Sequence, residues 1–157
     1  MNNNDVFRRV RYTFDLDDSQ MMEIFTLAEN PTTRAEVSDW LKRDDDEAFS
    51  PLEDKQLAIF LNGFIILKRG RQDGKLPEPE DQLTNNIILR KLKIALNLRD
   101  EGLIQVFKLA GTNMSKHELS AFFRKPGHQH YRLCKDQYLR HFMQGLQIKF
   151  RPRVRKM

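Results

Sequence analysis

The sequence predicts an all-α protein made by tandem duplication of a four-helix unit, with about eight helices packed around a pseudo-twofold axis. Residues 3–69 align with residues 85–151 without a gap, at a constant offset of 82 positions. Both copies repeat apolar residues at helical spacing, and we find no convincing strand pattern in either. The chain therefore divides into repeat one (1–69), a linker (70–82), repeat two (83–151) and a basic tail (152–157).

Identical residues recur at matched positions of the two copies. The polar ones include Asn3/Asn85, Asn4/Asn86, Arg8/Arg90, Asp54/Asp136 and Arg69/Arg151. A repeat this regular specifies the architecture, because each copy must fold as one unit, but it does not specify a function.

The first three helices of each copy have recognisable starts. Paired asparagines suited to N-capping, Asn3–Asn4 and Asn85–Asn86, predict the first helix. The second helix is predicted to begin at Asp18 or Asp100, which are also good caps. Capping-box patterns, in which a hydroxyl and a carboxylate satisfy free backbone N–H groups, open the third helix at 33–36 and 115–118.

The fourth helix is the longest, roughly Leu52–Arg69 and Cys134–Arg151, and contains glycine at matched interior positions, Gly63 and Gly145. Glycine inside a helix costs about 1 kcal/mol relative to alanine. The same cost at two equivalent positions predicts close approach of another helix. The linker that follows the first copy, Gly70–Gln82, is acidic and rich in proline and glycine.

The fourth helix of repeat one is apolar on nearly every side, whereas Ile59 and Ile65 have the polar counterparts His141 and Gln147 in repeat two. A helix that is apolar all round is buried all round. We expect it to lie centrally, with repeat two packed on it, or to line an oligomer contact. Ile59, Ile65 and Ile66 are the candidate interaction face.

The charge is divided unevenly between the copies. Residues 1–82 contain 11 Lys and Arg against 18 Asp and Glu, whereas residues 83–157 contain 16 against 4. Such asymmetry indicates a polyanionic partner, attraction between an acidic and a basic surface, or simply drift on solvated faces.

Composition places the chain in a soluble cytoplasmic class. It has no run of about 18 apolar residues that could cross a membrane. Residues 1–5 lack the features of a secretory signal, and a single cysteine, Cys134, fits a reducing compartment.

A zinc site is the one metal hypothesis that the sequence raises. His128, His130, Cys134 and His141 could in principle supply four ligands, but their spacing matches no established zinc motif. The repeat-one counterparts of Cys134 and His141 are apolar, which favours a small buried thiol and a partly buried imidazole. We expect no metal, no cofactor and, because no P-loop or GxSxG motif is present, no enzyme.

Nucleic-acid binding is the alternative function. Residues 109–119 resemble a helix-turn-helix, in which the start of the second helix reads base edges. Lys116 and His117 would contact bases, and Arg124, Lys125, Arg132 and Arg140 would contact phosphates.

Four segments carry a resemblance to a known family: Asn3–Tyr12, Phe60–Phe64, Asn85–Ala95 and Tyr131–Phe142. On these residues the chain resembles the YehS-like family of uncharacterised bacterial proteins. The resemblance implies an all-helical duplicated unit and supplies no catalytic residue, cofactor or partner. The residues themselves favour a non-enzymatic binding or protein-interaction module, with a protein partner or self-association ahead of nucleic acid.

Overall fold

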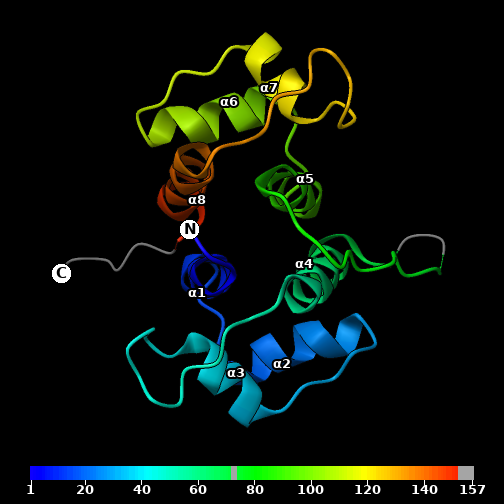
Figure 1. Ribbon diagram of the computed structural model, residues 1–157, viewed down its shortest axis with the longest axis vertical. Helices are drawn as coiled ribbons and strands as arrows, with labels where there is room; N and C mark the ends of the chain where they lie inside the picture. Colours follow the sequence, from blue (N-terminus) through cyan, green and yellow to red (C-terminus); the bar gives the residue numbers. More distant parts are fainter. Residues whose placement is uncertain (72–73, 152–157) are drawn as a thin grey trace.

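Four helices form the middle of the molecule, and a pair of helices covers each end of this group (Figure 1). The computed structural model describes residues 1–71 and 74–151, and within them it contains eight α-helices and no strand. The helices are α1 (Asn3–Thr13), α2 (Asp18–Leu27), α3 (Arg34–Leu41), α4 (Asp54–Arg69), α5 (Asn85–Ala95), α6 (Asp100–Leu109), α7 (Lys116–Phe122) and α8 (Asp136–Phe150).

The predicted duplication and pseudo-twofold axis are confirmed, because equivalent helices of the two repeats make equivalent contacts. Helices α1, α4, α5 and α8 lie in the middle, α2 and α3 cover the side of repeat one, and α6 and α7 cover the side of repeat two (Figure 1). The repeats meet where α1 packs on α8 and α4 packs on α5. These two contacts are equivalent, because α5 corresponds to α1 and α8 corresponds to α4.

One pair of hydrogen bonds between the repeats obeys this symmetry. The Asp54 carboxylate accepts from the Leu83 backbone nitrogen at 2.8 Å, and the Asp136 carboxylate accepts from the Met1 nitrogen at 2.9 Å. Positions 1 and 83 are related by the same offset as positions 54 and 136. Each aspartate thus joins its own repeat to the other one.

A second pair joins the opposite ends of the same helices. Arg69 at the end of α4 donates to the Ile94 carbonyl oxygen at 2.9 Å, and Arg151 after α8 donates to the Tyr12 carbonyl oxygen at 2.6 Å. In both places the arginine therefore adds a second hydrogen bond to a carbonyl oxygen at the end of the neighbouring helix, which also accepts from the backbone nitrogen of Asn97 or Asp15.

The first two helices of each copy begin where predicted, α1 at Asn3, α5 at Asn85, α2 at Asp18 and α6 at Asp100, but the predicted capping is wrong. The N-caps are one residue earlier, Asn2 for α1, Thr84 for α5 and Asp17 for α2. At α6 the cap position is Arg99, which makes no side-chain capping bond. The capping boxes at 33–36 and 115–118 are confirmed.

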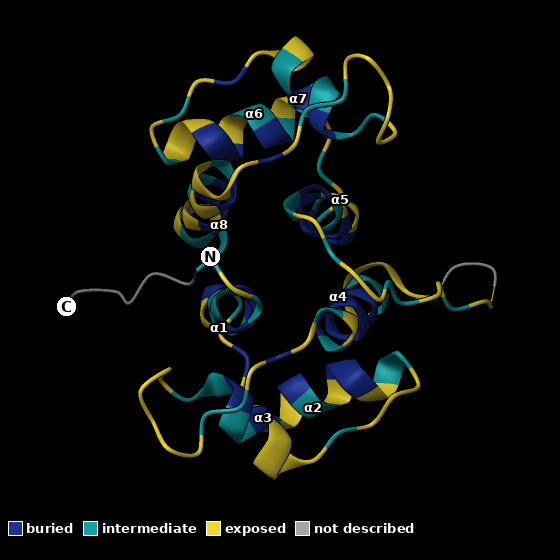
Figure 2. Cartoon of the chain, viewed as in Figure 1, coloured by how far each residue is buried: buried dark blue, intermediate teal, exposed yellow. Residues whose placement is uncertain are grey.

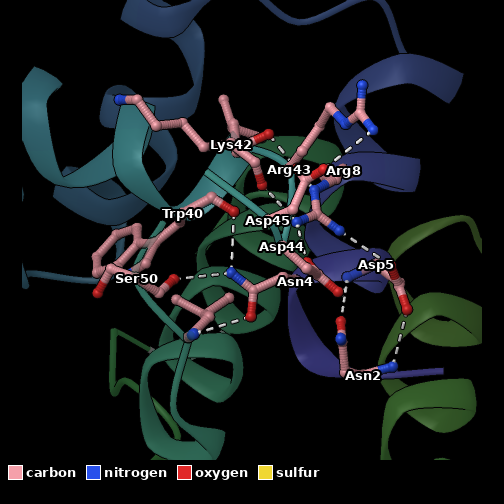
Figure 3. A network of polar contacts seen from close by, with 12 residues as sticks. Asn2, Asn4, Asp5, Arg8, Trp40, Lys42, Arg43, Asp44, Asp45 and Ser50 are labelled. Carbon is pink, nitrogen blue, oxygen red and sulfur yellow. Dashed lines mark hydrogen bonds and ion pairs between the residues drawn. The ribbon is translucent and has the colours of Figure 1, made fainter. Parts of the chain in front are cut away.

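Asn4 instead holds the loop that leads into α4, as Figure 3 shows. Its amide nitrogen donates to the carbonyl oxygens of Trp40 at 2.9 Å and Ser50 at 3.0 Å, and its amide oxygen accepts from the Leu52 backbone nitrogen at 2.9 Å. Helix α4 begins at Asp54, two residues later than predicted, after an extended cap residue at Glu53.

Asn86 repeats the arrangement in the second copy. It donates to the carbonyl oxygens of Phe122 at 3.0 Å and Arg132 at 2.8 Å, and it accepts from the Cys134 nitrogen at 2.8 Å. Both asparagines are buried. Their identity in the two copies reflects a shared structural task, since buried polar backbone groups need partners.

The predicted close approach at Gly63 and Gly145 is confirmed. A Cβ atom at Gly63 would overlap the Ile24 carbonyl oxygen of α2, and one at Gly145 would overlap the Val106 carbonyl oxygen of α6. Helices α2 and α6 alternate between buried and exposed residues, as helices packed on one face do (Figure 2). Among the described residues, no helix combines the length and the apolar character that crossing a membrane requires.

Candidate functional site

A groove runs along the contact between α1 and α8, and we name it the open groove. It encloses about 590 Å³ and is lined by Met1, Asp5, Arg8, Arg9, Tyr12, Arg140 and Gln147. On α1 the lining residues recur at spacings of three and four, which places them on one face of the helix. On α8, Arg140 and Gln147 lie seven residues apart, or about two turns.

The arginines of the open groove differ in their partners. Arg8 forms ion pairs with Asp5 at 2.9 Å and Asp44 at 2.8 Å, so its charge is neutralised within repeat one (Figure 3). The half-buried Arg9 reaches only the Gln147 amide oxygen, at 3.4 Å, and Arg140 is exposed. Among the ion pairs of residues 1–71 and 74–151, none involves Arg9 or Arg140. The groove therefore presents two cations that form no ion pair among the described residues. The pKa of the nearby Asp136 carboxyl is lowered by the Asn85 amide, then by the Met1 ammonium group and, to a smaller extent, by the charge of Arg140.

Tyr12 supplies an aromatic surface at one end of the open groove. It is 46% exposed, and the Arg151 guanidinium lies 4.1 Å from the centre of its ring. Because Arg151 also holds the Tyr12 carbonyl oxygen, the end of α1 is fixed against the end of α8. An exposed ring on a fixed helix end is suited to contact with an apolar or proline side chain.

The equivalent contact between α4 and α5 also holds a groove of about 590 Å³, and because the linker forms part of its lining we name it the covered groove. Its walls include Ile65 and Ile66 from α4 and Ile87, Lys91 and Ile94 from α5. Leu76, Pro77, Glu78 and Glu80 of the linker line the same space. The linker therefore lies over this side of the molecule.

Lys91 anchors the linker in the covered groove. Its side chain is buried, and its ammonium nitrogen lies 2.6 Å from the Asn62 amide oxygen and 3.0 Å from a Glu80 carboxylate oxygen. Lys91 is the counterpart of Arg9. In the covered groove Lys91 is thus paired with a carboxylate, whereas in the open groove Arg9 forms no ion pair with the described residues.

The candidate interaction face on the fourth helix is corrected by the structure. Ile59 is only 7% exposed and belongs to the core, so it cannot form a surface. Ile65 and Ile66 are partly exposed but line the covered groove. Helix α4 is apolar on most sides because repeat two and the linker lie on it. In repeat two, His141 accepts or donates a 2.6 Å hydrogen bond with the Thr112 hydroxyl, which explains why this position is polar there.

The candidate nucleic-acid contacts are spread over three segments. Lys116 and His117 are exposed at the start of α7, and Lys116 forms a 3.7 Å ion pair with Glu101. Arg124 and Lys125 follow in the loop after α7, and Arg140 lines the open groove with α1.

Arg132, the remaining candidate, is already engaged. Its guanidinium donates to the Tyr138 hydroxyl at 3.0 Å, lies 3.8 Å from a Glu118 carboxylate oxygen and stacks over the Tyr138 ring at 5.1 Å. These contacts give Arg132 a structural role in joining α7 to α8.

The four candidate zinc ligands have separate partners. His128 accepts from the His130 backbone nitrogen, and His141 is bonded to Thr112. Cys134 is buried, and burial raises the pKa of its thiol to about 12. In the part of the chain that the structure describes, no three His, Cys, Asp or Glu residues are placed to hold one metal ion.

Sequence reasoning missed Arg9 and Tyr12 because it concentrated on the basic second repeat. A signal was present in the aligned copies. Asp5 and Tyr12 lie on one face of α1 together with Arg9, while their counterparts Ile87 and Ile94 are apolar. A face that changes from apolar to polar between two copies of one fold indicates a change in what it contacts.

Comparison with known proteins confirms the family resemblance. The family described as "Protein of unknown function (DUF1456)" matches this chain twice, over residues 3–70 and 85–151. "Uncharacterized protein YehS" of Escherichia coli (strain K12) is 35% identical over 147 residues, which cover 93% of this chain and 94% of that protein. No solved structure matches the chain.

Proposed function

The chain belongs to the family of unknown function DUF1456, and we propose that it is a non-enzymatic protein-interaction module that binds its partner in the open groove. One observation carries the proposal. Two equivalent grooves lie between the repeats, and within residues 1–71 and 74–151 the chain covers one of them, with its own linker, and not the other. The other presents Arg9, Arg140 and the exposed Tyr12 ring to solvent.

A binding role agrees with the chemistry of these side chains. Arginine and tyrosine are enriched at protein interfaces, because each combines a large contact area with directional hydrogen bonding. The nucleophile that the sequence offers, Cys134, is buried with a raised pKa, which favours a structural thiol over a reactive one.

Site-specific photo-crosslinking in the native cells tests the proposal. A photoreactive amino acid is placed at Tyr12 in the open groove or at Ile94, its counterpart beside the linker. Tyr12 is 46% and Ile94 is 41% exposed, so the two positions are matched in accessibility. We expect a defined adduct with another protein from position 12 that is absent from position 94. Equal adducts at both positions, or none at position 12, would reject the open groove as the interface.

Nucleic-acid binding stays the second candidate, and the uneven charge of the chain favours it. Residues 83–157 contain 16 Lys and Arg against 4 Asp and Glu, and Lys116, His117 and Lys125 are exposed. A titration of the full chain with duplex DNA and single-stranded RNA tests it. Counterion release requires affinity to fall steeply as salt rises. The candidate is rejected if Lys116→Glu with Lys125→Glu leaves that affinity unchanged.

A further inference from the structure

We propose that the occupant of the open groove is an acidic, extended, proline-containing peptide segment of another protein, bound as the linker is bound in the covered groove. This inference rests on the proposed function and specifies the chemistry of the partner. The inference starts from the linker, which is an acidic, proline-containing segment that lines the equivalent, covered groove and pairs there with Lys91.

The linker shows what a groove of this fold accepts. Its segment Leu76–Asp81 reads Leu-Pro-Glu-Pro-Glu-Asp, with no basic residue. Proline disfavours the helical conformation at the preceding residue, so Pro77 and Pro79 keep this segment extended. Leu76 shares the covered groove with the isoleucines of α4 and α5, while Glu80 pairs with Lys91 at 3.0 Å. An apolar residue followed by a carboxylate is therefore the recognised pattern.

The open groove retains the cation and adds a second one. Arg9 stands where Lys91 stands, and its guanidinium can bind a carboxylate through two parallel hydrogen bonds. Arg140 replaces Ala58 of repeat one, so the open groove has a positive charge that the covered groove lacks. Tyr12 replaces Ile94 as the surface for a leucine or proline side chain. Asp5 also replaces Ile87, but its carboxylate is paired with Arg8 at 2.9 Å, so Arg9 and Arg140 are the cations that face an acidic peptide.

The segment that follows α8 in this chain is unsuited to the open groove by charge. The linker follows α4, and residues 152–157 follow α8 at the equivalent place. That tail, which lies outside the described residues, contains Arg153, Arg155 and Lys156 and no acidic side chain. Arg9 and Arg140 would repel it. Residues 152–157 therefore do not supply the matching carboxylates, and we assign them to another protein.

A peptide with the sequence of residues 74–82 is the probe, titrated against the full-length protein by calorimetry. We expect saturable binding that weakens as salt rises. Arg9→Gln combined with Arg140→Gln should lower the affinity about five- to tenfold, because two partly exposed ion pairs are lost. A peptide in which the residues matching Glu78 and Glu80 are glutamine should lose as much.

The matched control is Arg11→Gln combined with Lys149→Gln, which removes one positive charge from α1 and one from α8 outside the groove. Affinity in this control should stay within about twofold of the wild type. The proposal is overturned if the two double variants weaken binding equally, or if no binding occurs below about 1 mM. If position 12 still crosslinks to a protein in the latter case, the interface stands and only the acidic peptide is excluded.

Discussion

The covered groove and the open groove occupy equivalent places in a duplicated fold, yet the linker lies over one of them and no segment of residues 1–71 and 74–151 lies over the other. Residues that hold the fold together are identical at the two places: Asn4/Asn86, Asp54/Asp136, Gly63/Gly145 and Arg69/Arg151. Several residues that face the grooves differ, as in Arg9/Lys91 and Tyr12/Ile94, whereas Arg8 and Arg90 line the two grooves and are identical. The copies thus differ at several residues that line the grooves, and they keep the contacts that hold the fold.

The glycine contacts give the largest expected effect, and it should be the same in both copies. Gly63→Ala or Gly145→Ala would force the new methyl group into a backbone carbonyl of α2 or α6. The overlap should exceed the gain in helix propensity, so we expect the free energy of unfolding to fall by about 2–3 kcal/mol. Urea denaturation of each variant measures this value.

Gly102→Ala is the control for the glycine variants. Its new Cβ would lie 3.2 Å from a side-chain methyl group of Leu98, which can move, so stability should stay level or rise by up to about 1 kcal/mol. Equal losses at all three glycines would show that helix–helix approach is not the cause.

The buried asparagines should produce the next largest effect. Asn4→Ala leaves the Leu52 N–H without its partner, and Asn86→Ala does the same to the Cys134 N–H. We expect each to lower the free energy of unfolding by about 2 kcal/mol, measured by the same denaturation. The exposed Asn113→Ala should change it by less than about 0.5 kcal/mol. If the two variants lost clearly different free energies of unfolding, the two asparagines would not have equivalent structural roles.

The counterparts Lys91 and Arg9 should respond differently to loss of charge. Lys91→Met removes the cation that holds Glu80, so we expect a loss of about 1 kcal/mol and faster tryptic cleavage of the linker. Arg9→Met breaks only a 3.4 Å contact with Gln147 and should leave stability unchanged. If both variants lost the same stability, Arg9 would be a structural residue.

The smallest expected effect is on how the free energy of unfolding depends on pH in the acid range, and it comes from the Asp136 carboxyl. The Asn85 amide and then the Met1 ammonium group hold the pKa of this carboxyl below its ordinary value. Its contribution is therefore present above the ordinary value of about 3.9 and is lost as the pH falls through the lowered pKa. Asp136→Asn should reduce this acid-dependent part, measured as urea midpoints between about pH 7 and about pH 3. An unchanged pH profile would contradict this assignment.

The fold could be predicted from the sequence because the same structural signals occur at matched positions in both copies. The matched glycines, the capping boxes and the apolar fourth helix each predicted a feature that the structure shows. The role of Asn4 could not be predicted, because its partners at Trp40, Ser50 and Leu52 are distant in the chain.

The candidate groove depends on a long-range contact that the sequence does not reveal. Arg9 and Arg140 come together only because α1 packs on α8, and Lys91 loses its exposure only because the linker returns over α5. The net charge of the two copies favoured a binding site in the basic second repeat. The local balance of α1 is basic although repeat one is acidic, and only packing shows which of its arginines are already paired.

The most direct test of the difference between the grooves is a residue-resolved NMR titration of the full chain with the peptide of residues 74–82. We expect the backbone amide signals of residues 8–12 and 140–147 to shift with increasing peptide, while those of residues 90–94 stay in place because Glu80 of the linker already pairs with Lys91 there. Shifts confined to residues 90–94, or no shifts along α1 and α8, would contradict the assignment of the open groove as a binding site.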